Sequence, residues 1–105
     1  MTEKPYALVL DPADNVATLL YDAVCGETVS LKGTAGSVII SENISAGHKC
    51  ALKPIENGGI IIKYGQKIGT AKNRINPGEW IHLHNMVSAV DLTFKNRIDS
   101  CAVKR

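Results

Sequence analysis

The chain has 105 residues, enough for one domain with a single hydrophobic core. Its 12 basic and 10 acidic residues give a net charge of +2, which argues against a nucleic-acid-binding protein. The mildly basic C-terminus is interpreted as a solvated end: Lys95, Arg97, Lys104 and Arg105. No apolar run could cross a bilayer and no apolar leader follows Met1, so we expect a cytoplasmic protein that contacts no membrane.

The cysteines indicate reduced thiols. Cys25, Cys50 and Cys101 are odd in number, widely spaced and without a C-x-x-C pair. This pattern is typical of reduced cytosolic thiols and not of a disulfide framework or a zinc site.

The first third of the chain predicts strands. Tyr6 to Leu10 is short, apolar and β-prone, and Asp11-Pro12 ends it. The next apolar run, Val16 to Tyr21, fits a helix with Asp14 as its N-cap and fits a buried strand equally well. We favour the strand because the rest of the chain is β-prone.

The middle of the chain contains further short strands separated by turns. Thr28 to Leu31 and Ser37 to Ile40 are expected to pair as a hairpin. The later strands are predicted at Lys49 to Leu52, Gly59 to Tyr64, Lys67 to Ala71 and Glu79 to His84. Because Ile60-Ile61-Ile62 is the most β-prone run, we expect Gly59 to Tyr64 to be a central strand.

One turn pattern recurs: an isoleucine, two polar or small residues, and a glycine. It occurs at Ile44 to Gly47, Ile55 to Gly58 and Ile75 to Gly78, with a looser copy at Ala23 to Gly26. Glycine tolerates positive φ, and Pro77 before Gly78 suits a type II turn. We expect each isoleucine to point inward and anchor its turn.

These elements predict an all-β domain of short strands with glycine turns over residues 1–86. From Met86 the pattern weakens, although Val87, Val90, Leu92 and Phe94 retain some alternation. Residues 87–105 are therefore assigned as a C-terminal tail, which either docks or remains loose.

His82-Leu83-His84 is the sharpest candidate site. On a strand, alternation would place both imidazoles on one face and turn Leu83 to the core. Two adjacent imidazoles can ligate a divalent metal or act as a general base beside an orienting group. The plainer alternative is two exposed polar residues on an edge strand. Asn85 could hydrogen-bond a carboxylate or hydroxyl, or close a turn.

Two further groups are candidate binding residues. His48 and Lys49 follow the turn glycine Gly47, and together they suit a carboxylate or another anion, although an ordinary polar turn has the same composition. Tyr64 could pack in the core with its hydroxyl at the rim of a site. The chain has no G-x-S-x-G, P-loop, G-x-G-x-x-G or H-E-x-x-H motif, so it does not look like a complete enzyme of a common type.

Five motifs, in order, resemble one known domain: Asp14-Asn15-Val16-Ala17, Gly47-His48-Lys49, Lys63-Tyr64-Gly65, Ile68-Gly69 and Gly78-Glu79-Trp80-Ile81-His82-Leu83-His84-Asn85. They are similar to the SAF-type domain of the altronate/galactarate dehydratase family, which also occurs as a separate subunit in sulfolactate sulfo-lyase. The resemblance covers Tyr6 to about Asn85 and implies a small β-clip fold.

The resemblance also implies a function. The chain would be the small subunit or N-terminal domain of a metal-dependent lyase that dehydrates a sugar acid or related 2-hydroxy acid. His82, His84 and His48 would be catalytic, and Lys49, Asn85 and Tyr64 would bind substrate. His82 and His84 would also ligate a divalent metal, with iron as the expected ion and further ligands from a large catalytic subunit.

A second hypothesis is a non-catalytic module that binds carboxylates or carbohydrates, or assembles a larger partner. A nucleic-acid binder has only the basic C-terminus in its favour. The sequence leaves the acid substrate and a homo-oligomeric state open.

Overall fold

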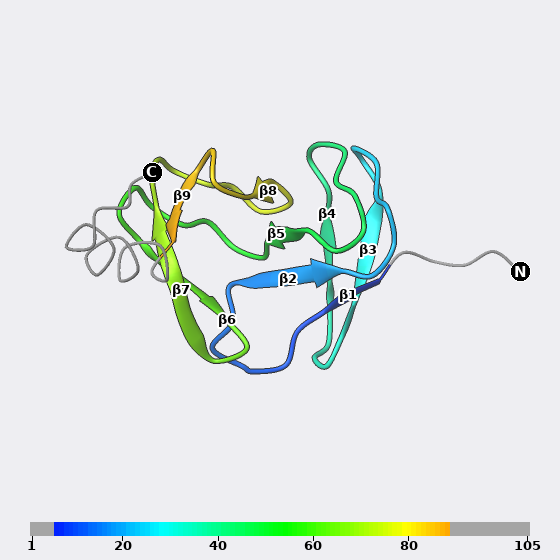
Figure 1. Ribbon diagram of the computed structural model, residues 1–105. Coiled ribbons are helices and arrows are strands. Elements are labelled where there is room, and N and C mark those ends of the chain that lie inside the picture. The colour runs from blue at the N-terminus through cyan, green and yellow to red at the C-terminus, as the bar shows by residue number, and fades with distance from the viewer. Residues whose placement is uncertain (1–5, 89–105) are drawn as a thin grey trace, which may run out of the picture.

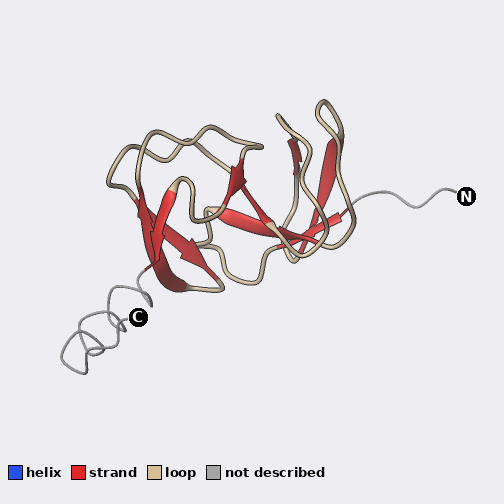
Figure 2. Ribbon diagram, turned by 45° about the horizontal axis from the view of Figure 1, so that its top comes forward, coloured by secondary structure: helices blue, strands red, loops and turns tan. Residues whose placement is uncertain are grey.

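The computed structural model describes residues 6–88 as nine short strands without a helix (Figure 1, Figure 2). The strands are β1 (Tyr6–Leu8), β2 (Val16–Leu19), β3 (Thr28–Lys32), β4 (Ser37–Ile39), β5 (Lys49–Ala51), β6 (Ile60–Lys63), β7 (Gln66–Ala71), β8 (Trp80–Ile81) and β9 (Met86–Ser88). They form a six-stranded sheet in the order β4-β3-β1-β2-β5-β8 and a three-stranded sheet in the order β6-β7-β9. The all-β prediction is confirmed.

The run after Asn15 is a strand and not a helix. β2 pairs antiparallel with both β1 and β5, near the middle of the six-stranded sheet. Both of its faces are buried: Val16 contributes to one core, while Ala17 and Leu19 contribute to the other. A strand buried on both faces has a continuous apolar sequence, which is why hydrophobic periodicity alone could not separate strand from helix.

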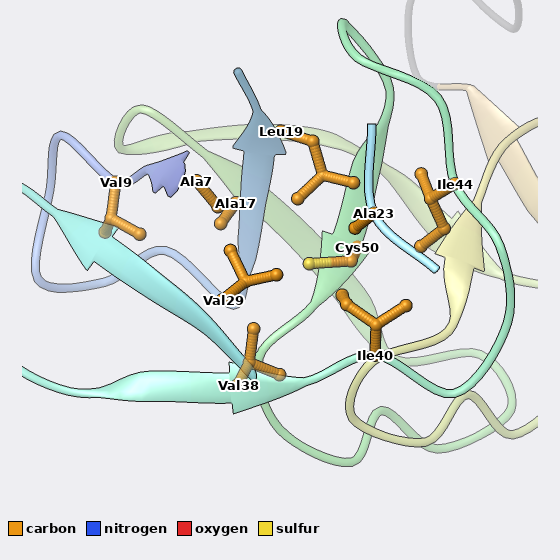
Figure 3. Close-up of a cluster of buried hydrophobic side chains, with 10 residues drawn as sticks. All are labelled: Ala7, Val9, Ala17, Leu19, Ala23, Val29, Val38, Ile40, Ile44 and Cys50. Carbon is orange, nitrogen blue, oxygen red and sulfur yellow. The ribbon is translucent and has the colours of Figure 1, made fainter. Parts of the chain in front are cut away.

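Two hydrophobic cores lie on opposite faces of β2, β5 and β8. Figure 3 shows the buried residues of the first core: Ala7, Val9, Ala17, Leu19, Ala23, Val29, Val38, Ile40, Ile44 and Cys50. The second consists of Val16, Ala51, Ile55, Ile61, Ala71, Ile75, Ile81 and Met86, against the three-stranded sheet. The neighbours Cys50 and Ala51 therefore face different cores, as alternation along a strand requires.

The repeated turns are paired across the fold. Ala23 forms an antiparallel bridge with Ile44, and Ile55 forms one with Ile75. All four residues are buried, with at most 4% of each exposed, so the inward anchors are confirmed. The glycine of each turn has positive φ, between 84° and 93°. Glu79 N donates to Asn76 O, which closes the turn that contains Pro77 and Gly78.

The isoleucine run does not form a central strand, and that prediction is wrong. β6 lies at the edge of the three-stranded sheet, with β7 in the centre, and Ile60 is 50% exposed. The free edge of β6 is covered by Asn15. The Asn15 side chain donates from Nδ2 to Ile60 O at 2.9 Å and accepts at Oδ1 from Ile62 N at 2.8 Å. One polar side chain thus satisfies two backbone groups at the edge of β6 that another strand would otherwise pair with.

The end of the described chain also differs from the prediction. β8 contains only Trp80 and Ile81, and residues 82–85 form a turn into β9. β9 pairs antiparallel with β7, so the fold continues through Ser88, past the boundary placed at residue 86. Val90, Leu92, Phe94, Cys101 and the basic C-terminal residues lie outside the described residues. Nothing in residues 6–88 is a helix long and apolar enough to cross a membrane.

Candidate functional site

The three histidines of the protein surround its single tryptophan. The ring of His82 stacks on Trp80 with centroids 5.5 Å apart and planes 8° apart. The ring centroid of His84 lies 4.9 Å from that of Trp80, and the His48 ring meets Trp80 edge-on at 5.4 Å. His48 and His82 are also in edge contact at 5.6 Å. We refer to His48, Trp80, His82 and His84 as the histidine–tryptophan cluster.

The two later histidines reach the cluster from a turn and not from a strand. The expected alternation over His82-Leu83-His84 is therefore wrong, although both rings contact Trp80. Leu83 does not turn to the core: its side chain is 51% exposed, between two exposed histidines. In a short turn the hydrogen bonds of the turn set the direction of each side chain, whereas in a strand the side chains alternate between two faces.

Asn85 is the residue that makes this turn. Its side chain is buried, with Oδ1 accepting from His82 N at 3.0 Å and Nδ2 donating to Trp80 O at 2.9 Å. Asn85 N also donates to His82 O at 3.1 Å. Both ends of the amide are thus used within the turn, where Asn85 holds His82 and His84 over Trp80. Its predicted role in binding substrate stays a prediction.

A hydrogen bond orients the His48 ring. Trp80 Nε1 donates to His48 Nδ1 at 3.2 Å, and both residues are half-buried. An indole nitrogen can only donate, so His48 Nδ1 must accept and the proton of the neutral ring lies on Nε2. His48 therefore presents an N–H donor at Nε2, which suits an oxygen of a substrate or of a partner chain.

The backbone of Trp80 is held as well. Trp80 N donates to Glu42 Oε2 at 3.0 Å, and Trp80 is register partner to Cys50 of β5. The tryptophan is thus anchored by a carboxylate, by a strand and by its ring contacts. Sequence reasoning gave neither Trp80 nor Glu42 a role. The single tryptophan of the chain, two residues before His82, was a sequence signal for Trp80. No local pattern indicated Glu42.

Lys49 and Tyr64 lie in a different group from the histidines. Lys49 is register partner to Thr18 of β2, on the face that carries Val16 and Ala51. The Tyr64 hydroxyl donates to Thr18 Oγ1 at 3.3 Å, and Lys63 Nζ lies 4.9 Å from the centroid of the Tyr64 ring. β5 begins at Lys49, and the hydrogen bond from Leu19 N to His48 O extends its pairing by one residue. Successive residues of this extended segment face opposite sides, so Lys49 diverges from His48. We refer to Thr18, Lys49, Lys63 and Tyr64 as the basic group.

Electrostatics connects the two lysines of this group. Burial lowers the pKa of Lys49 below its ordinary value of 10.5, and the positive charge of Lys63 lowers it further. Both lysines are half-buried. The only ion pair within residues 6–88 is the one between Arg74 and Glu56, so neither lysine is neutralised by a carboxylate there.

The donor set bears on the expected metal. Residues 6–88 contain no group of three or more His, Cys, Asp or Glu side chains that could hold a metal ion. His82 and His84 are exposed imidazoles, which suit iron and other transition metals as two ligands of a larger set. His48 is less suited, because its Nδ1 already accepts from Trp80 and its Nε2 carries the proton.

Comparison with known proteins shows which family this chain is related to. The altronate/galactarate dehydratase SAF domain matches residues 5–89. Altronate dehydratase of Bacillus subtilis (strain 168) is 42% identical over 72 residues, which are 69% of this chain and 14% of that enzyme. Galactarate dehydratase (L-threo-forming) of Escherichia coli (strain K12) is 36% identical over 80 residues, 76% of this chain and 15% of the enzyme.

A smaller relative is matched over a larger share of its length. The (2R)-sulfolactate sulfo-lyase subunit alpha of Chromohalobacter salexigens is 34% identical over 47 residues, which are 45% of this chain and 50% of that subunit. Since the match to the SAF domain spans most of the chain, and relatives of both sizes share it, the resemblance in the sequence is confirmed. The chain belongs to the altronate/galactarate dehydratase SAF domain family.

Proposed function

We propose that this chain is the SAF component of a metal-dependent hydro-lyase that acts on a sugar acid or a related 2-hydroxy acid. The observation that carries the proposal is the convergence of His48, His82 and His84 on Trp80 at the surface of a dehydratase-family SAF domain. Dehydration of a 2-hydroxy acid needs a group that moves the proton next to the carboxylate and a group that assists the departing hydroxyl. Imidazoles suit both tasks near neutral pH.

The proposed catalyst includes a large partner. This chain spans about one seventh of the length of the altronate and galactarate dehydratases it matches. The sulfo-lyase subunit alpha is only about twice as long as the 47 residues it shares with this chain. It is a small, separate subunit, which supports the proposal that this chain is one as well. We therefore assign most of the catalytic residues to a large dehydratase subunit, with this chain supplying the histidine–tryptophan cluster at the shared surface.

The chain's own residues define what the cluster would do. His82 and His84 would hold a divalent metal, with iron as the expected ion, together with ligands from the large subunit. The bound metal would supply Lewis-acid assistance to the leaving hydroxyl. His48 would donate from Nε2 to a substrate oxygen, since Trp80 keeps its Nδ1 as an acceptor. Asn85 would keep His82 and His84 in place by closing their turn.

The proposed location is the cytoplasm. Cys25 is exposed, Cys50 is buried, and both are free thiols. Burial raises the pKa of the Cys50 thiol to about 11, which keeps it protonated and unreactive. An exposed free thiol at Cys25 is compatible with a reducing compartment.

A non-catalytic assembly module is the second candidate, and one observation favours it. Leu83 is an apolar side chain, 51% exposed, at the tip of the turn between His82 and His84. Burial of this exposed apolar side chain against a partner chain would be favourable. In this alternative the cluster binds the large subunit and takes no part in proton transfer.

The test is turnover by the complex of this chain with a large dehydratase subunit. The substrates are D-altronate, galactarate and (2R)-sulfolactate. Each is tested with the wild-type chain, the His82→Ala, His84→Ala double variant, Leu83→Ser and the surface control Asn73→Ala. Dehydration or sulfite release should fall at least about 100-fold in the double histidine variant while co-purification persists. Asn73→Ala should match wild type.

Two results would contradict the lyase proposal. One is wild-type turnover in the double histidine variant, with Leu83→Ser abolishing co-purification, which identifies an assembly module. The other is the absence of turnover on all three acids in an intact complex. Metal analysis of the same complexes provides a separate readout, because the double variant should lose the bound ion.

A further inference from the structure

The basic group has an unbalanced charge. Lys49 and Lys63 come from different sheets and are connected through two side chains between them: Thr18 is register partner to Lys49 and hydrogen-bonds Tyr64, whose ring lies against Lys63 Nζ. The positive charge of Lys63 also lowers the pKa of Lys49. Both are half-buried, and neither forms an ion pair within residues 6–88. Two like charges on half-buried side chains repel each other, and a bound anion would relieve that repulsion.

Two hydroxyl groups lie beside these lysines. Thr18 faces Lys49 in register across β2 and β5, and Thr18 Oγ1 accepts from the Tyr64 hydroxyl at 3.3 Å. The Thr18 hydroxyl proton therefore remains available to a further acceptor. Lys63 Nζ lies against the Tyr64 ring, 4.9 Å from its centroid. The group thus offers two ammonium donors and one hydroxyl donor side by side.

The hairpin tip that carries Tyr64 is fixed in place. Tyr64 has φ of 54°, the left-handed region, and Gly65 N donates to the buried Asp14 Oδ1 at 2.8 Å. Asp14 Oδ2 accepts from Leu10 N and Asp11 N, and Asp11 Oδ1 accepts from Ala13 N. These carboxylates accept from backbone donors and hold the tip, and within residues 6–88 neither forms an ion pair with Lys49 or Lys63.

We propose that Thr18, Lys49, Lys63 and Tyr64 form a binding site for the carboxylate group of a small organic acid. A carboxylate has two oxygens and one negative charge, which would accept from the Lys49 and Lys63 ammonium groups and from the Thr18 hydroxyl. Its charge removes the repulsion between the lysines. The choice of a sugar acid as ligand rests on the proposed function, whereas the anion site itself rests on the arrangement of the basic group.

This site is distinct from the histidine–tryptophan cluster. Lys49 and His48 are adjacent in sequence but face opposite sides of β5 and its extension, where Leu19 N donates to His48 O at 2.8 Å. Binding of a carboxylate by the basic group therefore requires none of the three histidines. Lys63 and Thr18 gain a binding role that sequence reasoning did not give them.

The experiment is an amide NMR titration of the full 105-residue chain at constant ionic strength. The probes are D-gluconate, inorganic phosphate and the neutral polyol D-glucitol. D-Gluconate should give saturable shifts at Thr18, Lys49, Lys63 and Tyr64, and D-glucitol should give none. Lys63→Gln and Lys49→Gln should each weaken D-gluconate binding at least about 10-fold. The matched control Lys53→Gln, an exposed lysine in the loop after β5, should change it less than about 2-fold.

Several outcomes would overturn the site. They are absence of saturable shifts with D-gluconate, equal weakening by Lys53→Gln, and equal shifts with D-glucitol. Tighter binding of phosphate than of D-gluconate at the same residues would overturn the carboxylate assignment. The two proposals fail separately: His82→Ala, His84→Ala should leave D-gluconate binding unchanged, and loss of turnover in that variant says nothing about Lys63.

Discussion

Trp80 Nε1 donates a hydrogen bond to His48 Nδ1 at 3.2 Å, joining two residues that are 32 positions apart in sequence. The bond determines which nitrogen of His48 carries the proton, because indole cannot accept. It also brings His48 into the group that contains His82 and His84. A tryptophan thus acts here as both a stacking surface and a tautomer selector.

Trp80→Phe should remove this selection while keeping an aromatic ring. We expect the neutral His48 ring to lose its preference for the Nε2 proton, which ¹⁵N NMR of the imidazole nitrogens measures directly. The free energy of unfolding should fall by about 0.5–1.5 kcal/mol from the hydrogen bond alone, with a further loss from the smaller ring. An unchanged His48 tautomer in Trp80→Phe would contradict the role given to the indole.

Gly78→Ala should destabilise the fold far more than Gly26→Ala. Both glycines have positive φ, 85° and 93°, so each alanine carries a left-handed cost of about 1–2 kcal/mol. A Cβ at position 78 would lie 2.0 Å from Ile39 O, whereas one at position 26 meets nothing within 4 Å. Urea denaturation of both variants isolates the clash, and equal losses of stability would rule it out.

Asn85→Ala should loosen the turn that presents His82 and His84. It removes two hydrogen bonds from a side chain that is only 5% exposed, and leaves His82 N and Trp80 O without this partner. We expect a loss of about 1–3 kcal/mol in the free energy of unfolding.

Asn73→Ala is the matched control for that variant. The exposed Asn73 side chain makes one local hydrogen bond, to Arg74 O, so its loss should cost less than about 0.5 kcal/mol. Thermal melts of both proteins provide the comparison, and similar melting temperatures would show that Asn85 is dispensable for the turn.

Lys49 should make stability depend on pH in the alkaline range. Its pKa is lower in the folded protein than in the unfolded chain, so in the window from the lowered value up to about 10.5 the unfolded chain binds more protons. Stability contributed by this group therefore rises as pH rises through that window. At neutral pH the group is charged in both states and its full penalty is present.

Lys49→Met removes this dependence. The variant should be more stable than wild type at pH 7, and the difference should shrink as pH rises from the lowered pKa of Lys49 to about 10.5. Lys53→Met, at an exposed lysine, should show no such trend. Urea titrations at several pH values measure the difference, and a constant gap between wild type and Lys49→Met would contradict the lowered pKa that burial and Lys63 give Lys49.

The strand content and turns of this protein are determined largely by local sequence. The Ile-x-x-Gly turns could be read because glycine at positive φ and a buried anchor are local requirements, met at Gly47, Gly58 and Gly78. Strand identity was also readable at the hairpin of β3 and β4. Family membership followed from the spacing of the motifs along the chain.

Only the tertiary structure decided which segments and side chains are neighbours in the fold. The edge position of β6 depends on Asn15, which is 45 residues from Ile60. The direction of His82 and His84 depends on Asn85, whose buried amide replaces the expected strand with a turn. The separation of Lys49 from His48, and the meeting of Lys49 with Lys63, depend on which core each face of β5 covers. Periodicity reports only the local preference of a segment, and long-range hydrogen bonds and charges determine its partners.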